Sequence, residues 1–413
     1  MLAEALERSG LKAIIVGDEA DGKNAEYFDN LEAQNDLVIL ISTIGDSSWF
    51  KLSLRQADRI WVLARPDAVP SSPLLPDETS PAKNLRLIDI VLIQHNNGRR
   101  VSSPTDWIDA ASAARCFHWT GLGNTESDRL ARIMAGRSIG LVLSGGGARA
   151  YAHIGLVKAL RESQCPIDFV GGSSMGAIIA ACVAHGWEDE EIDFRIRKAF
   201  VESNPLGDYH LPVVSLVKGK RVDTRLKEHF GDINISDLKL PFFAVSTNLT
   251  DGAIRVHNRG HLRTALRATI ALPGILPPVV DNGEVLVDGA VLNNFPVNVM
   301  RNMHRGYIIG CDVARAPEGL KADDFLNPPD FTGWVARHGF KTTPPLASLL
   351  MRSATVSVNP NEGRDQTDML VLPELPETDL RDWEDYDRVV EAGYEAAQSA
   401  IQRASGPLAR MFK

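Results

Sequence analysis

The chain has 413 residues, of which 44% are hydrophobic and 23% are charged, and its formal net charge is -9. This composition is typical of a globular protein with room for two domains. The acidic balance disfavours nucleic-acid binding, and four cysteines without a C-x-x-C pair indicate neither a zinc site nor a disulfide framework. The N-terminus lacks the order of a signal peptide, and every apolar run falls short of the ~20 residues that span a bilayer. We therefore expect a cytoplasmic protein that meets a membrane, if at all, peripherally at its inner surface.

Residues 1–135 alternate short apolar runs with helical or polar stretches, the runs lying at 12–17, 36–43, 59–67 and 88–95. Because this alternation is typical of parallel sheets, we predict a Rossmann-like α/β segment, nucleotide-binding-like but degenerate. Its loop GDEADGKN (17–24) nearly matches a phosphate-binding P-loop. Asn24, however, replaces the Ser or Thr that would hold magnesium, and three acids would repel phosphate, so a surface loop is the favoured interpretation.

A second series of strands and helices begins near residue 136 and includes IGLVL, IDFVGG, PFFAVST, GEVLVD and YIIGCDV. It predicts an α/β domain with a mostly parallel central sheet over 136–315. Residues 316–413 are predicted to form a loop-rich extension with a strand-like MLVLPEL and a final docking helix. In this extension, Trp334, Phe340 and 345–351 form either a lid or membrane-contact patch or, as we favour, part of the core.

Two adjacent serines in VGGSSMGA (170–177) lie between an apolar strand and a helix. Only Ser174 has a glycine two residues away on each side, since Gly172 and Gly176 complete the pattern G-x-S-x-G. Glycines there permit the sharp strand-to-helix turn that exposes a nucleophilic serine, and the helix N-terminus adds positive partial charge. A loop that only turns the chain could carry the same five residues, but the flanking strand and helix favour Ser174 as a nucleophile.

The segment LVLSGGGARA (141–150) is another strand that runs into glycines and a helix, a turn whose backbone N–H groups can bind an anion. The candidate donors are the amides of Gly145, Gly146 and Gly147. One candidate anion is a dinucleotide pyrophosphate, with Asp168 as the ribose-binding acid; the other is the oxyanion of an acyl-transfer reaction. Asp168 opens its apolar strand instead of ending it, so an oxyanion hole is favoured. Arg149 is available to fix this loop or to approach an anionic head group.

A serine nucleophile needs a base, and two of the ten histidines, His304 and His338, follow Asp288 in the sequence. His304 lies in a polar stretch and His338 in a loop-rich region, and neither stands in a glycine-marked turn. His153 is expected to pack against or cap a helix. By contrast, VLVDGA ends an alternating strand with Asp288 and turns at Gly289. Because the carboxyl ends of parallel strands lie at one edge of a sheet, Asp288 can reach a serine there. A plain D-G turn is the alternative interpretation.

Taken together, GGGARA, GSSMG and VDGA resemble, in order and spacing, the patatin-like phospholipase family, which uses a Ser-Asp dyad without a histidine. RATIALPGILPPVV (267–280) is similar to the family's block between nucleophile and base. NLTDGAIRVHNRG, LVDGAVLNNFP and DVARAPEG resemble the neuropathy target esterase branch. The family resemblance extends over roughly residues 137–315. It implies a three-layer α/β/α hydrolase domain with a mostly parallel central sheet.

The resemblance also implies roles for single residues. Ser174 would be the nucleophile, Asp288 the base and the three glycines the oxyanion loop, with Arg149 at the family's basic position. Ala150 stands where the family has glycine, and we expect the site to tolerate it. The implied chemistry is hydrolysis of a fatty-acyl ester through an acyl-enzyme, with no metal or cofactor.

We therefore expect a serine lipid acyl hydrolase that acts on a phospholipid or lysophospholipid and has no nucleic-acid partner. A general carboxylesterase or thioesterase is a second interpretation, because the same dyad would serve it. A weakly catalytic lipid- or nucleotide-sensing module is a third, suggested by Ala150 and by the loop at 17–24.

Overall fold

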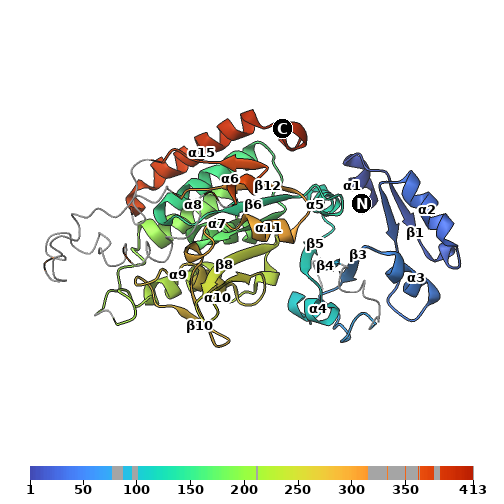
Figure 1. Ribbon diagram of the computed structural model, residues 1–413, viewed down its shortest axis with the longest axis horizontal. Helices are drawn as coiled ribbons and strands as arrows, with labels where there is room; N and C mark the ends of the chain where they lie inside the picture. Colours follow the sequence, from blue (N-terminus) through green and yellow to red (C-terminus); the bar gives the residue numbers. More distant parts are fainter. Residues whose placement is uncertain are drawn as a thin grey trace. The chain divides into compact units, whose positions relative to one another are not determined.

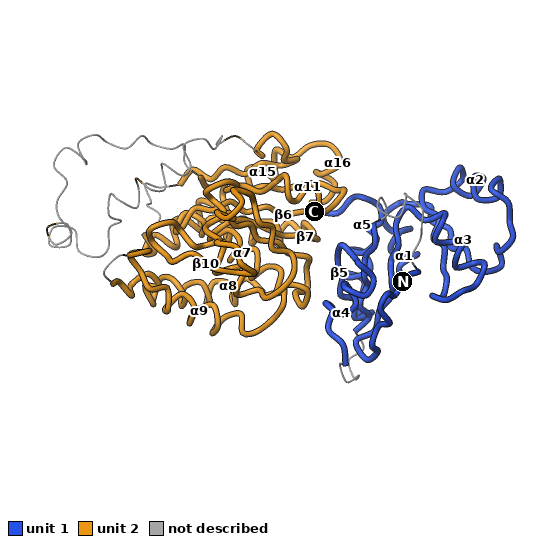
Figure 2. Tube along the Cα trace, turned by 60° about the horizontal axis from the view of Figure 1, so that its bottom comes forward, with its two compact units in different colours: residues 1–138 blue, residues 139–413 orange. Residues whose placement is uncertain are grey.

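The structure is a computed structural model that describes residues 1–76, 87–94, 101–210, 213–314, 363–375 and 382–412, with the single residues 333, 349 and 361. The chain divides into two compact units, residues 1–138 and 139–413 (Figures 1 and 2). The predicted lid or core residues Trp334 and Phe340, residues 345–351 apart from Leu349, and His338 lie outside the described residues.

The first unit contains two small parallel sheets where the sequence predicted one α/β layer. One sheet pairs β1 (Ala13–Val16) with β2 (Leu37–Leu40), and the other has the order β3 (Arg59–Ala64), β4 (Leu87–Ile93), β5 (Arg115–Trp119). Strand β5 was not predicted. The helices are α1 (Leu2–Arg8), α2 (Ala25–Gln34), α3 (Ser48–Gln56), α4 (Pro104–Ala111) and α5 (Asn124–Met134).

In the P-loop-like segment at 17–24, a carboxylate of the segment itself binds a backbone N–H group. The backbone N–H of Gly17 donates to the Glu19 carboxylate at 2.8 Å, a bond that lowers the pKa of Glu19. Asn24 caps α2, its side-chain oxygen accepting from the N–H of Tyr27 at 3.1 Å. The segment is thus built as a capped helix entry, in agreement with the surface-loop interpretation.

The second unit is built on one large, mostly parallel sheet, which confirms the predicted fold class. Its strand order is β10-β11-β8-β7-β6-β12-β13, and β9 pairs with β8. All residues of β6, β7 and β8 are buried, so both faces of the sheet centre are covered, as in a three-layer α/β/α arrangement. The strands are β6 (Ile139–Leu143), β7 (Phe169–Ser173), β8 (Phe242–Asn248), β9 (Ala253–His257), β10 (Val279–Asp281), β11 (Glu284–Asp288), β12 (Tyr307–Cys311) and β13 (Met369–Val371).

Helices surround this sheet (Figure 1). They are α6 (Ala152–Glu162), α7 (Ser174–His185), α8 (Asp189–Ile196), α9 (Lys220–Phe230), α10 (Leu262–Thr269), α11 (Val297–Met303), α15 (Tyr386–Arg403) and α16 (Gly406–Ala409).

Strands β7 and β11 approach each other head-on along one edge of β8. β7 runs parallel to β8 up to Ser173, opposite Val245, and β11 runs antiparallel to it, with Asp288 opposite Ser246. The other edge of β8 pairs with β9 over residues 244–248. β7 and β11 therefore share one edge, and their carboxyl ends meet. The expectation that Asp288 ends a parallel strand is wrong, and an antiparallel strand brings it to the serine.

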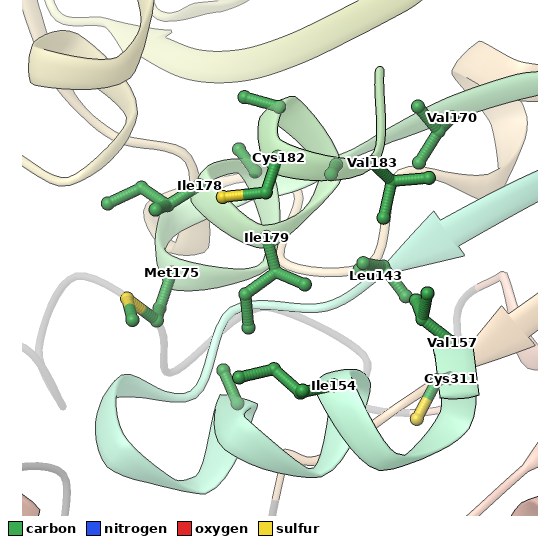
Figure 3. Close-up of a cluster of buried hydrophobic side chains, with 14 of the residues drawn as sticks. Leu143, Ile154, Val157, Val170, Met175, Ile178, Ile179, Cys182, Val183 and Cys311 are labelled. Atoms are coloured by element: carbon green, nitrogen blue, oxygen red, sulfur yellow. The ribbon is translucent and has the colours of Figure 1, made fainter. Parts of the chain in front are cut away.

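The core of the second unit surrounds α7, of which every residue except His185 is buried. Figure 3 shows Met175 and Ile179 of α7 gathered with Ile154 of α6 and Leu143 of β6. Full burial of one such side chain contributes about 1.5–3 kcal/mol relative to exposure. This packing fixes the helix that begins at the candidate nucleophile.

The described part of 316–413 belongs to the same compact unit as the predicted hydrolase domain. β13 pairs in parallel with β12, and α15 lies along α6 (Figure 1). The two helices touch through glycines: a Cβ on Gly155 would overlap the Val390 carbonyl oxygen, and one on Gly393 would overlap the backbone of Ala152. The α6–α15 contact therefore leaves no room for a methyl group.

We predict that Gly393→Ala lowers the free energy of unfolding by about 1–3 kcal/mol, measured by urea denaturation. Alanine favours a helix over glycine by about 1 kcal/mol, so a loss can come only from the contact with α6. The control is Ser399→Ala, at an exposed position of the same helix, which should change stability by less than about 0.5 kcal/mol. Equal or higher stability of Gly393→Ala would contradict the close contact.

Candidate active site

Ser174 lies at a strained turn between β7 and α7. Its φ is +51°, in the left-handed region that few side chains adopt, and it is the first residue of α7. A Cβ on Gly172 would overlap the carbonyl oxygen of Leu143, and one on Gly176 would overlap that of Ser144. Both positions therefore require glycine, because the end of β6 passes directly beside the turn. The arrangement is that of a nucleophile elbow with its serine at a helix N-terminus.

Thr269, the last residue of α10, holds the backbone of this turn. Its Oγ1 accepts from the N–H of Ser174 at 2.8 Å and donates to the carbonyl of Val245. The buried hydroxyl thus satisfies an amide that begins α7 and ties the elbow to β8. A strained φ persists only where neighbouring groups enforce it, and Thr269 is such a group.

Asp288 faces Ser174 directly. The hydroxyl of Ser174 donates to Asp288 Oδ2 at 2.7 Å, and the N–H of Ala290 donates to Oδ1 at 2.8 Å. Full burial raises the pKa of Asp288 to about 7, although these two hydrogen bonds pull it down. Gly289 allows the close fit, since a Cβ there would overlap the hydroxyl of Ser173. A buried carboxylate with a pKa near neutral, bonded to a serine, can accept that serine's proton.

The glycine loop passes beside the serine, but its three amides are not equivalent. A Cβ on Gly145 would lie 2.9 Å from the Cβ of Ser174. The N–H of Gly145 donates to the carbonyl of Asn294 at 3.1 Å, so this amide is not available to an anion. Within the described part of the chain, the N–H groups of Gly146 and Gly147 donate no hydrogen bond. The available anion donors are therefore two of the three predicted ones.

The glycine loop is anchored on both sides. The Asn294 side chain donates from Nδ2 to the carbonyl of Gly145 at 3.1 Å, and the N–H of Val313 donates to the hydroxyl of Ser144 at 2.9 Å. Arg149 reaches back to the carbonyl of Gly146 at 3.4 Å, a long contact. Ala150 is fully buried in the short 3-10 helix that follows, so the loop accommodates a methyl group there.

The histidines weighed from the sequence have other partners. His153 is fully buried and bonded to the carbonyl of Ser144 at 2.9 Å, and burial lowers its pKa to about 4. His304 stacks on Phe169 with 5.0 Å between ring centroids, beside Gly140 of β6. Among the described residues, the hydroxyl of Ser174 bonds to a carboxylate and to no histidine.

The position of Asp168 argues against a dinucleotide site. The carboxylate of Asp168 is buried and accepts from the N–H of Ile139 at 2.9 Å, at the start of β6. A ribose-binding acid must lie at the carboxyl end of its strand. Asp168 instead lies at the amino ends of β6 and β7, so it cannot take that role.

Within the described residues, His, Cys, Asp and Glu side chains form no cluster of three or more that could hold a metal ion. Over the same part of the chain, every helix is too short or too polar to cross a membrane.

Sequence reasoning did not single out Thr269 or Asn294. Both lie in segments that carried the family resemblance, RATIALPGILPPVV and LVDGAVLNNFP. The only local signal is a polar residue inside an apolar run. Their roles depend on partners 95 and 149 residues away in the chain.

Comparison with known proteins found a family match and several similar chains. The family model for patatin-like phospholipase matches residues 141–301. An uncharacterized NTE family protein of Mycobacterium tuberculosis is 32% identical over 93% of this chain, and the chain spans 65% of that protein's length. A neuropathy target esterase of Drosophila melanogaster is 37% identical over 51% of this chain and 15% of its own length. The human patatin-like phospholipase domain-containing protein 6 is 32% identical over 65% of this chain and 22% of its own length.

We predict that a fluorophosphonate probe labels Ser174 at a rate that rises with pH and levels off above about pH 7. Asp288 accepts the serine proton only when ionised, so below its pKa the rate should fall about tenfold per pH unit. The measurement is the labelling rate constant across a pH series, with Ser174→Ala as the unlabelled control. A rate independent of pH from about 5 to about 9 would contradict this role of Asp288.

A second prediction concerns Thr269. Thr269→Val keeps the shape but leaves the N–H of Ser174 without an acceptor, and we expect labelling to slow at least about tenfold. Thr269→Ser keeps the hydroxyl and should label within about threefold of the unchanged chain. Urea denaturation of both variants separates a positioning effect from simple loss of fold. Equal labelling of the two variants would show that the hydrogen bond is not needed.

Proposed function

Because this chain carries a patatin-like phospholipase domain of the neuropathy target esterase branch, we propose that it is a serine lipid acyl hydrolase of phospholipase or lysophospholipase type. One observation carries the proposal: the hydroxyl of Ser174 donates to the buried carboxylate of Asp288 at 2.7 Å. The unengaged amides of Gly146 and Gly147 on the adjoining loop supply the second requirement of acyl transfer, donors for a developing oxyanion.

In the proposed reaction, Ser174 Oγ attacks the acyl carbon of the lipid ester as Asp288 takes the hydroxyl proton. The N–H groups of Gly146 and Gly147 stabilise the negative charge on the carbonyl oxygen. The ester bond breaks, the proton on Asp288 passes to the departing alcohol, and an acyl-serine remains. Water, deprotonated by Asp288, then attacks the acyl-serine and releases the fatty acid with Ser174 restored.

Asp288 can perform both proton transfers because burial sets its pKa near 7. An ordinary exposed aspartate, with a pKa near 3.9, would be too weak a base at neutral pH. The helix dipole of α7 favours negative charge on Ser174 as the proton leaves.

The test is fatty-acid release from a lysophosphatidylcholine. We expect Ser174→Ala and Asp288→Asn to reduce kcat at least about a thousandfold. Ser173→Ala is the matched control: it is the neighbouring serine, it is also buried, and its hydroxyl has no partner among the described residues. Its activity should stay within about threefold. Full activity of Asp288→Asn would exclude the dyad.

The same assay separates the proposed activity from a general esterase or thioesterase. The unchanged chain is compared on the lysophospholipid, a water-soluble short-chain ester and an acyl-CoA. A higher kcat/KM on the lysophospholipid supports the proposal, whereas preference for the short-chain ester or the thioester replaces it. Absence of hydrolysis in all three would favour a sensing module.

A further inference from the structure

Two adjacent valines in a loop of the second unit are exposed to solvent. Val213 is 92% exposed and Val214 is 63% exposed. The loop is closed by an antiparallel bridge between Tyr209 and Val217, and the N–H of His210 donates to the carbonyl of Leu216. The next two residues, Ser215 and Leu216, are buried, so the exposure is confined to the valines among these four neighbours.

Three cations follow the valines in the sequence, just beyond the Tyr209–Val217 bridge that closes the loop. They are Lys218, before α9, and Lys220 and Arg221, at the start of α9, and all three are exposed. Within the described residues, none of them forms an ion pair with a carboxylate. Of the two acids nearest in the sequence, Asp223 pairs with Arg267 at 3.1 Å, and Asp208 accepts from the backbone N–H of Arg221 at 3.3 Å. The guanidinium of Arg221 also donates to the carbonyl of Asn204 at 3.4 Å. Exposed apolar side chains together with cations that lack a carboxylate partner are the chemistry of a surface that binds anionic lipid.

This loop is tied to the candidate active site through one short segment. The N–H of Leu216 donates to the carbonyl of Gly274, and Val217 donates to Ile275. The same segment begins at Thr269, whose hydroxyl holds Ser174. Gly274 lies five residues after Thr269 in the chain, a path of at most about 18 Å even when fully extended. The loop that carries the valines is therefore joined to the residue that holds Ser174 by one short segment.

Another exposed valine of this unit has acidic neighbours instead of basic ones. Val280 on β10 is 71% exposed, but Asp281 and Glu284 stand beside it at the β10–β11 turn. With a net charge of -9, the whole chain would be repelled by an anionic bilayer. Only a local cluster such as the one around Val213 can reverse that sign at short range.

We propose that Val213, Val214, Lys218, Lys220 and Arg221 form a docking surface for an anionic lipid bilayer. The valines enter the interface, and the three cations contact anionic head groups. The proposal rests on the function proposed above, because it states where the hydrolase meets its lipid.

The test is sedimentation with phosphatidylcholine vesicles, with or without phosphatidylserine, using Ser174→Ala so that no lipid is consumed. We expect binding to the vesicles with phosphatidylserine that weakens as salt increases. The triple variant Lys218→Gln, Lys220→Gln, Arg221→Gln should bind about a hundredfold more weakly, from roughly fivefold per charge. Val213→Ser with Val214→Ser should weaken binding at least about tenfold.

Val280→Ser is the matched control and should bind vesicles like the parent protein. Unchanged binding of both docking variants would overturn the proposal, as would lack of binding to any vesicle. A dimer that Val213→Ser with Val214→Ser dissociates, without vesicle binding, would make this surface a contact between copies of the chain.

Hydrolysis distinguishes this proposal from the function on which it rests. In the chain with Ser174 intact, the docking variants should lose rate on vesicle phospholipid relative to a water-soluble short-chain ester. If no ester is hydrolysed, the proposed function fails while vesicle binding by Ser174→Ala still decides the docking surface. If both substrates are hydrolysed and the variants lose neither binding nor rate, the docking surface fails alone.

Discussion

The head-on meeting of β7 and β11 along one edge of β8 is the constraint on which the candidate site depends. Val245 and Ser246 are successive residues of β8, and they face Ser173 and Asp288 respectively. Successive residues of a strand are about 3.4 Å apart along its axis, so the ladder itself sets the spacing of the two chain ends. The Ser174–Asp288 hydrogen bond is thus positioned by backbone pairing at the centre of the sheet, with no flexible loop between the groups and their scaffold.

The same constraint determines the chemistry that the pair can perform. The centre of the sheet is covered on both faces, so Asp288 has no solvent to stabilise its charge and its pKa rises to about 7. The hydrogen bonds from Ala290 and Ser174 keep the pKa of Asp288 from rising further. The position also costs strain, because Ser174 must adopt a positive φ to leave β7 and begin α7 beside the carboxylate. Thr269 and the glycines of the turn allow the fold to hold that conformation.

Local signals in the sequence were sufficient for the serine turn and for most strands of the second unit. The glycines around Ser174 and the apolar runs before them act over a few residues, and the folded chain uses them at those positions. The structure brings Asp288 to Ser174, but on an antiparallel strand where the sequence predicted a parallel one. The dipeptide Asn282–Gly283 is a strong hairpin signal that was overlooked. Both residues have positive φ, and they join β10 to β11, which makes β11 antiparallel.

The sequence could not specify which of the three similar glycine amides forms a hydrogen bond with a residue far away in the chain. Gly145, Gly146 and Gly147 are alike as a motif, and only the fold distinguishes them. Asn294, 149 residues further along the chain, accepts from the first amide and donates back to its carbonyl, whereas the other two amides donate no hydrogen bond within the described residues. Long-range pairing therefore decides which of the three amides are free of a hydrogen bond in the described part of the chain. The loop is fixed by Asn294 and by the hydroxyl of Ser144, upstream of the position where the methyl group of Ala150 stands.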